Sequence, residues 1–173
     1  MIIFDCNYKL KGECKMEIEY GYDYSEEIKK LFLEYTDVLV ENDSNFAEYL
    51  EVQSYDSELQ HLEHKYGLPY GRLYIAKVDN KTAGCIGLRK IDENNCEMKR
   101  LYVRPEFREH KIAEKLVTMI IEDAKKIGYK SILLDTLPFL EAAIHLYKKF
   151  GFYEIEKYNS SPMDTSIYMK LDL

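Results

Sequence analysis

The sequence predicts a mixed α/β domain in which helices flank a central twisted, mixed sheet. Its 173 residues are 46% hydrophobic and 32% charged, a composition typical of one soluble globular domain with a substantial core. Alternating and helical apolar patterns follow one another in the order β-α-α-β-β-β-α-β-α-β-β. The strand at residues 131–135 is short and apolar, as a strand buried on both faces is. These observations favour a sheet covered by helices.

We expect a single domain over residues 16–173, preceded by residues 1–15 as either a further strand or a flexible extension. Residues 16–20 alternate as a strand does, and a helix is expected from Ser25, because acidic side chains follow it and favour a helix N-terminus. Its apolar stripe has helical spacing and consists of Ile28, Leu31, Phe32, Tyr35, Val38 and Leu39. After a break at residues 42–45, further helical regions are expected at 46–53 and through Leu59 and Leu62.

A hairpin and a central strand follow. Residues 72–78 and 82–91 read as paired strands, and Asp79-Asn80 is a typical hairpin turn. Residues 92–95 form a second turn into a strand that ends at Arg104-Pro105, because proline cannot donate to a sheet ladder.

The second half begins with a loop at residues 106–110. A helix is then expected from Lys111 to Gly128, since apolar residues recur at three- and four-residue spacing and glycine is common just after a helix. After the apolar strand at 131–135, we expect Thr136 to cap a helix with Pro138 in its first turn. That helix is expected to bury Phe139, Ala143, Leu146 and Phe150. Residues 153–155 and 166–171 should form a closing antiparallel pair.

The stretch from residue 95 to 128 is the strongest candidate for a ligand site. A strand, a short loop and a helix N-terminus bring unpaired amide groups to the positive end of a helix dipole, which suits a phosphate group. The alternative is an ordinary strand-to-helix crossover without a ligand.

The same stretch resembles the acyl-coenzyme A signature of the GNAT superfamily of N-acetyltransferases, through Arg108, Lys111 and Ala113. Two later segments are also similar, LDTLPFLEAAIHLYKKFGF at 134–152 and the final strand SIYMKLDL. The resemblance covers roughly residues 16–173 and implies a GNAT-like fold. The chain departs from the family pattern at Glu109 and Lys111, where members commonly have glycine.

The resemblance implies a site for acetyl-coenzyme A (acetyl-CoA) as co-substrate. The pyrophosphate is expected at the backbone of Arg108, Glu109, His110, Lys111, Ile112 and Ala113. The pantetheine arm is expected to pair with the strand edge at Leu101, Tyr102 and Val103, with the amide near Leu101 polarising the thioester carbonyl. Lys111 either offsets the charge of Glu109 or binds phosphate directly.

The resemblance also implies two catalytic residues. Tyr147 occupies the place of a tyrosine that protonates the departing thiolate; the alternative is an aromatic half-buried on an amphipathic helix. Glu97 corresponds to a glutamate that deprotonates the amine, directly or through water; the alternative is a solvated carboxylate or an ion pair with Lys99 or Arg100. Leu140 stands where many members have a pantetheine-binding asparagine.

Other features restrict the function. The net charge of −7 argues against nucleic acid, and no apolar run is long enough for a membrane span. The four cysteines lack C-x-x-C spacing, so we expect free thiols, no metal site and a cytoplasmic location; Cys96 is a nucleophile only in a ping-pong variant. His61 and His64, three residues apart beside Glu58 and Glu63, are expected to be surface residues on a polar helix.

The expected function is acetyl-CoA-dependent N-acetylation by direct attack of an amine on the thioester. Residues 17–63 carry 14 acidic and 2 basic side chains, a net of −12, and this excess predicts a small cationic amine as acceptor. The carboxylates that motivate it are Glu41, Asp43, Glu48 and Glu51. Two alternatives are a non-catalytic acyl-CoA-binding regulator and an interaction protein that uses the acidic helices; a homodimer is also left open.

Overall fold

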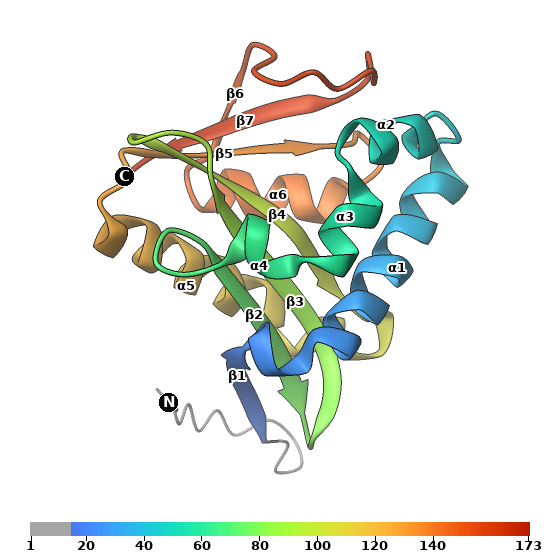
Figure 1. Ribbon diagram of the computed structural model, residues 1–173, viewed down its shortest axis with the longest axis vertical. Coiled ribbons are helices and arrows are strands. Elements are labelled where there is room, and N and C mark those ends of the chain that lie inside the picture. The colour runs from blue at the N-terminus through green and yellow to red at the C-terminus, as the bar shows by residue number, and fades with distance from the viewer. Residues whose placement is uncertain (1–14) are drawn as a thin grey trace.

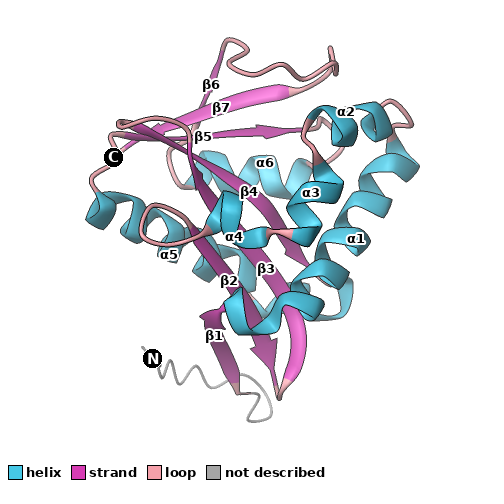
Figure 2. Cartoon of the chain, viewed as in Figure 1, coloured by secondary structure: helices cyan, strands magenta, loops and turns pink. Residues whose placement is uncertain are grey.

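The computed structural model describes residues 15–173, so the expected extension at the N-terminus lies, except for Lys15, outside the described residues. Helices cover both faces of one open sheet (Figures 1 and 2). The strands are Met16–Tyr20 (β1), Arg72–Val78 (β2), Lys81–Lys90 (β3), Asn95–Val103 (β4), Ser131–Thr136 (β5), Tyr153–Ile155 (β6) and Ile167–Asp172 (β7). The α-helices are Ser25–Asn42 (α1), Phe46–Val52 (α2), Tyr55–Gln60 (α3), Leu62–Tyr66 (α4), Ile112–Ile127 (α5) and Glu141–Lys149 (α6). Two 3-10 segments are Gly21–Tyr24 (η1) and Pro105–His110 (η2).

The strands of the described chain lie in the order β1-β2-β3-β4-β5-β7-β6. The β4–β5 pair is parallel and the other neighbouring pairs are antiparallel. Asp79 and Asn80 both have positive φ, as the expected two-residue hairpin turn between β2 and β3 requires. The predicted mixed α/β class and central mixed sheet are confirmed.

The alternation of β2 divides the core between the two faces of the sheet. Tyr74 and Ala76 belong to a cluster that contains the buried face of α5, whereas Leu73 and Ile75 pack with α1, α3 and α4. Because successive strand side chains point to opposite faces, one strand supports both clusters. In Figure 1, α1, α3 and α4 accordingly lie in front of the sheet and α5 behind it.

Three details of the helices differ from the expectation. Thr136 is the last residue of β5, paired with Ile167, and caps no helix. A turn closed by the Leu140 amide on the Leu137 carbonyl (3.0 Å) delays α6 until Glu141, so Pro138 lies before the helix and Phe139 is 38% exposed. Tyr147, rather than Phe139, is the buried residue of this segment.

The other differences are smaller. The expected third helix is divided into α3 and α4 at His61, whose φ of −136° and ψ of 64° are not helical. Helix α5 begins at Ile112 instead of Lys111, and the expected loop at 106–110 is the 3-10 segment η2. Gly128, with φ of 102°, ends α5 as expected.

Candidate active site

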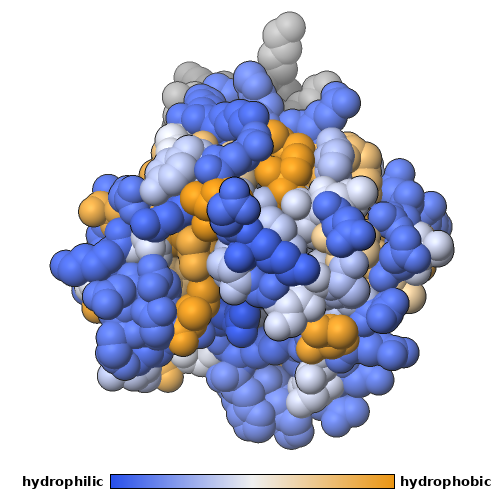
Figure 3. All heavy atoms as spheres, turned by 90° about the horizontal axis from the view of Figure 1, so that it is seen from above, coloured by the Kyte–Doolittle hydropathy of each residue, from blue (hydrophilic) through white to orange (hydrophobic). Residues whose placement is uncertain are grey.

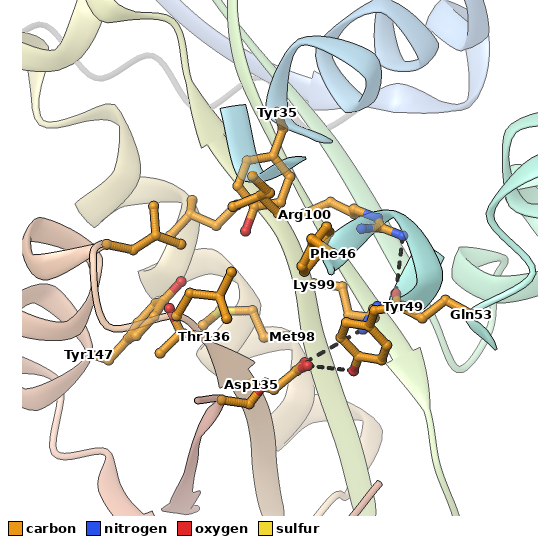
Figure 4. A pocket seen from close by; sticks show the side chains of 15 residues that line it. Tyr35, Phe46, Tyr49, Gln53, Met98, Lys99, Arg100, Asp135, Thr136 and Tyr147 are labelled. Atoms are coloured by element: carbon orange, nitrogen blue, oxygen red, sulfur yellow. Dashed lines mark hydrogen bonds and ion pairs between the residues drawn. The ribbon is translucent and has the colours of Figure 1, made fainter. Parts of the chain in front are cut away.

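A pocket lies where β4 and β5 separate. The two strands pair only between residues 95–97 and 131–133, and the described sheet has no pairing between them beyond Glu97. The pocket fills this gap and is covered by α1 and α2 (Figure 4). Its lining residues are Tyr35, Leu39, Phe46, Tyr49, Gln53, Met98, Lys99, Arg100, Leu101, Asp135, Thr136, Leu137, Leu140, Tyr147 and Ser166.

A β-bulge in β4 shapes the wall of the pocket. Lys99 pairs with Gly87 and Tyr102 with Cys85, so Arg100 and Leu101 together face the single residue Ile86. Arg100 has a φ of 57°. The extra residue reverses the alternation, and Leu101 therefore packs on the α5 side of the sheet with Met98 instead of on the side of Lys99.

A buried ion pair holds the bulge. Glu58 of α3 accepts hydrogen bonds from Arg100 Nε at 2.7 Å and from Nη2 at 2.9 Å, which is a bidentate arrangement. The same carboxylate accepts from Lys65 Nζ at 2.6 Å and the Tyr66 hydroxyl at 2.7 Å. Burial alone would raise the pKa of Glu58, but the charges of Arg100 and Lys65 outweigh it and lower the pKa to about 2. Helix α3 is thus fixed to the strand beside the pocket.

Tyr147 lies on α6 with its side chain directed to the pocket (Figure 4). It is 7% exposed, and its ring lies 5.8 Å from that of Phe152, centre to centre. Burial raises the pKa of Tyr147, and the nearby Tyr35 and Asp135 act in the same direction. The phenol is therefore protonated at neutral pH and able to donate a proton or a hydrogen bond.

Asp135 is the acidic side chain of the pocket lining. Its Oδ2 accepts a hydrogen bond from the Tyr49 hydroxyl at 2.5 Å, and its Oδ1 lies 3.7 Å from Lys99 Nζ (Figure 4). Burial raises the pKa of Asp135, but Lys99 and the hydrogen bond from Tyr49 outweigh this effect, and the net pKa is lowered. Sequence reasoning missed this residue; the signal was an acid at the end of an otherwise apolar strand.

Glu97 does not line the pocket. It is fully buried on β4, where its Oε1 accepts from the Tyr158 hydroxyl at 2.7 Å and its Oε2 is paired with Arg89 Nε. Lys99 Nζ lies 3.6 Å from the same Oε2. This geometry is the ion pair that the sequence left open for Glu97, with Lys99 and Arg89 as partners, while Arg100 binds Glu58 instead. The role of Glu97 as a base stays a prediction.

The expected phosphate loop has a turn at Lys111. This residue has φ of 54° and ψ of 25°, the left-handed conformation that glycine adopts readily, and helix α5 follows it directly. Among the described residues, no side-chain hydrogen bond caps this helix, so the N–H groups of its first turn have no side-chain acceptor. Arg108 donates to the Val103 carbonyl at 3.3 Å and connects η2 to the end of β4.

The edge of β4 that faces β5 is unpaired beyond Glu97 in the described sheet, and Leu101, Tyr102 and Val103 lie on this stretch. Leu101 and Tyr147 both line the pocket beside this edge, and Lys111 follows the end of β4 through η2; the binding of coenzyme by these residues stays a prediction. Leu140, the residue before α6, lines the pocket with an apolar side chain.

Two other groups considered in the sequence lie elsewhere. Cys96 is fully buried, and burial raises its pKa to about 12, which disfavours the thiolate that a ping-pong nucleophile needs. His61, Glu63 and His64 are exposed and place their ligand atoms within 4.8 Å of one another, whereas Glu58 is buried with Arg100.

Among residues 15–173, no helix combines the length and hydrophobicity needed to cross a membrane.

Comparison with known proteins gives consistent matches. The model of the acetyltransferase (GNAT) family matches residues 26–152. An uncharacterized N-acetyltransferase of Schizosaccharomyces pombe is 42% identical over 130 residues, which are 74% of this chain and 80% of that protein. The crystal structure of a GNAT-family acetyltransferase from Staphylococcus aureus Mu50 is similar with a TM-score of 0.71 and 25% identity, over 91% of this chain and 98% of that one. A GNAT-family acetyltransferase from Elizabethkingia anophelis, crystallised with acetyl-CoA bound, has a TM-score of 0.51 and 26% identity over 60% of this chain and 76% of its own.

Proposed function

Because this chain belongs to the GNAT acetyltransferase family and is an N-acetyltransferase that uses acetyl-CoA, we propose that it acetylates a small primary amine in the pocket between β4 and β5. The observation that carries the proposal is the open edge of β4 beside Tyr147, with the N-terminus of α5 following the end of this strand through η2.

The backbone of residues 108–113 is proposed to hold the pyrophosphate of acetyl-CoA. The unpaired amides at the start of α5 and the positive end of its dipole favour an anion there. Lys111, in the turn immediately before the helix, adds a positive charge to a loop whose sequence also contains the acidic Glu109.

The pantetheine arm is proposed to pair with β4 at residues 101–103, as an added strand between the separated β4 and β5. Since the bulge places Leu101 beside the pocket that Tyr147 also lines, the thioester would lie between the Leu101 amide and the Tyr147 hydroxyl. The amide would then stabilise the negative charge that develops on the carbonyl oxygen.

The reaction follows from this placement. The unprotonated amine nitrogen bonds to the thioester carbonyl carbon, and the carbon–sulfur bond then breaks with its electron pair on sulfur. Tyr147 donates its hydroxyl proton to the thiolate, and a base takes the proton that the nitrogen loses. Glu97 is the proposed base, acting through water because it does not line the pocket. No covalent enzyme intermediate is formed.

The acceptor expected from the sequence is a small cationic amine. The side chains of Glu41, Asp43, Glu48 and Glu51 do not line the pocket, so they can act on a cation only through long-range attraction. The cationic acceptor therefore stays a prediction, to be tested together with acceptors of other charge.

Calorimetric titration with acetyl-CoA and a thiol-release assay across an amine panel test this function. We expect one acetyl-CoA site and thiol release that depends on the amine. Failure of acetyl-CoA to produce heat or a thermal shift at millimolar concentration would contradict the proposed site. Binding without transfer to any amine would instead favour the acyl-CoA-binding regulator.

A further inference from the structure

Lys99 is held in the pocket wall by two long ion pairs. Its side chain is only 8% exposed, and it lines the pocket beside Asp135 (Figure 4). The nearest carboxylate oxygens, on Glu97 and Asp135, lie 3.6 and 3.7 Å from Nζ, which is longer than an ordinary hydrogen bond. Within the described part of the chain, the Lys99 ammonium donates no hydrogen bond. A buried ammonium has three donors, and one directed to the pocket is a site for an oxygen acceptor.

The other carboxylates nearby are already occupied. Glu97 is paired with Arg89 and accepts from Tyr158, and Glu58 accepts from Arg100, Lys65 and Tyr66. The ion pairs form two groups beside the pocket. Glu97 and Asp135 balance Arg89 and Lys99, whereas Glu58 faces both Lys65 and Arg100 and leaves a net of +1, so the two groups together have four cations against three anions.

The net charge of these buried residues is positive, whereas the charge of the nearby exposed surface is negative. Glu41, Glu48 and Glu51 are exposed to solvent, where salt screens their effect. The cluster below the pocket is largely buried, so its charges act at short range and with little screening. The groups that touch an acceptor therefore include both a cation and an anion, a combination that does not suit a molecule with positive charge alone.

Lys99 and Asp135 form a pair of opposite charges on the pocket wall, with Asp135 toward Tyr147, whose pKa it influences. From this pair we propose that the acceptor carries a carboxylate next to its primary amine, as an α-amino acid does, with the amine at Asp135 and the carboxylate at Lys99. The apolar lining residues Leu39, Phe46, Leu137 and Leu140 then favour an apolar side chain. This inference rests on the proposed acetyltransferase function and specifies its acceptor.

The test compares acceptors that differ only in the carboxylate. Rates with phenylalanine and phenethylamine, and with leucine and 3-methylbutylamine, are measured at fixed acetyl-CoA and expressed per unprotonated amine. Spermidine is included as a polycation. For the wild type, we expect kcat/KM to be higher for each amino acid by about tenfold or more, the effect of one hydrogen bond between charged groups. Lys99→Met should bring the ratio near one, and Lys99→Arg should restore it. Lys125→Met, at an exposed position on α5, is the matched control.

The ratio within one variant does not depend on how much of that variant is folded, so it separates acceptor recognition from a loss of stability. A preference for spermidine or for the amines without carboxylate, or a ratio unchanged in Lys99→Met, would overturn this inference while leaving acetyl transfer intact. If no amine were acetylated, the proposed function would fail, and calorimetry with coenzyme A present would decide the acceptor question. Binding of phenylalanine but not of phenethylamine, lost in Lys99→Met, would support the inference; the absence of that difference would overturn it.

Discussion

Tyr147 and Asp135 line the same pocket in opposite protonation states. A phenol is protonated at neutral pH, and burial raises the pKa of Tyr147 further, whereas Lys99 and Tyr49 keep the Asp135 carboxylate ionised despite burial. At neutral pH the pocket therefore contains a phenol that can donate a proton and a carboxylate that can bind a cation or accept a proton. This pairing suits a reaction in which a thiolate gains a proton and an amine loses one.

Tyr147→Phe should lower kcat by about 10² to 10⁴, the usual contribution of one general acid, and leave the affinity for acetyl-CoA nearly unchanged. Because the pKa of Tyr147 is raised, the wild-type rate should show no alkaline decline from this group near neutral pH. Steady-state rates and calorimetry check both points, with Tyr70→Phe at an exposed position as control. A turnover within about twofold of the wild type would assign Tyr147 to packing.

Glu97→Gln should depress kcat/KM most at low pH, where most amine is protonated and a base is most needed. Asp135→Asn is the informative companion, because Asp135 lines the pocket and Glu97 does not. pH profiles of both variants measure the difference. A loss that is the same at every pH would show that Glu97 only maintains its ion pair with Arg89, and a pH-dependent loss in Asp135→Asn alone would move the role of base to Asp135.

The β-bulge of strand β4 was not predicted from the sequence, although the spacing of its apolar residues contains a sign of it. Its apolar residues alternate at Cys96 and Met98, and then the spacing changes to three residues before Leu101 and returns to two at Val103. That change is the signature of the bulge, in which Arg100 is the extra residue. The buried Glu58 that holds Arg100 lies 42 positions away in the chain, and no local pattern could reveal their contact.

Glu58→Gln should lower the free energy of unfolding by about 3–5 kcal/mol at pH 7, because it leaves the buried Arg100 without its charge partner. The pKa of Glu58 is lowered to about 2 in the folded protein, below its unfolded value of about 4.3. The wild type therefore has this stability in full above about pH 4.5 and loses it as the pH falls toward 2. Urea unfolding of the wild type and of Glu58→Gln is measured from pH 7 to pH 3, with the exposed Glu51→Gln as control. The difference in free energy of unfolding between the wild type and Glu58→Gln should become smaller as the pH falls. A constant difference over that range would contradict the role of the ionised carboxylate.

Substitutions of Lys111, in the turn before α5, can separate the effect of its charge on acetyl-CoA binding from the effect of its backbone conformation on stability. Lys111→Ala should weaken acetyl-CoA binding by removal of the charge while it keeps the left-handed strain. Lys111→Gly removes the charge as well but should raise Tm relative to Lys111→Ala, because glycine accepts φ of 54° without cost. Calorimetry and thermal unfolding measure the two effects, and Glu109→Gly should strengthen binding. Stronger binding in Lys111→Ala would show that the loop does not hold phosphate.

Over the whole molecule, the order of strands and helices was largely predictable, because strand alternation and helical spacing are local properties of the sequence. The polar wall of the pocket was not. Lys99, Asp135 and Tyr49 come from β4, β5 and α2. They meet where the pairing of β4 with β5 has ended, which is a property of the folded chain and not of any local sequence pattern. Charge summed along residues 17–63 indicated an acidic surface but not the mixed charge of the pocket.

Figure 3 shows one face of the molecule, seen from above the view of Figure 1. Hydrophilic residues cover most of this face, and hydrophobic ones are divided into separate patches (Figure 3). The homodimer stays a prediction, as does a cytoplasmic location.

A crystal structure with acetyl-CoA tests the central claim most directly, since every role assigned above depends on where the thioester lies. We expect the pyrophosphate at the amides of residues 108–113, the pantetheine arm along residues 101–103 of β4, and the thioester sulfur within hydrogen-bond reach of the Tyr147 hydroxyl. The acetyl group should point to the part of the pocket that Asp135 and Lys99 line. Acetyl-CoA bound away from the opening between β4 and β5, or a thioester turned away from Tyr147, would contradict the account.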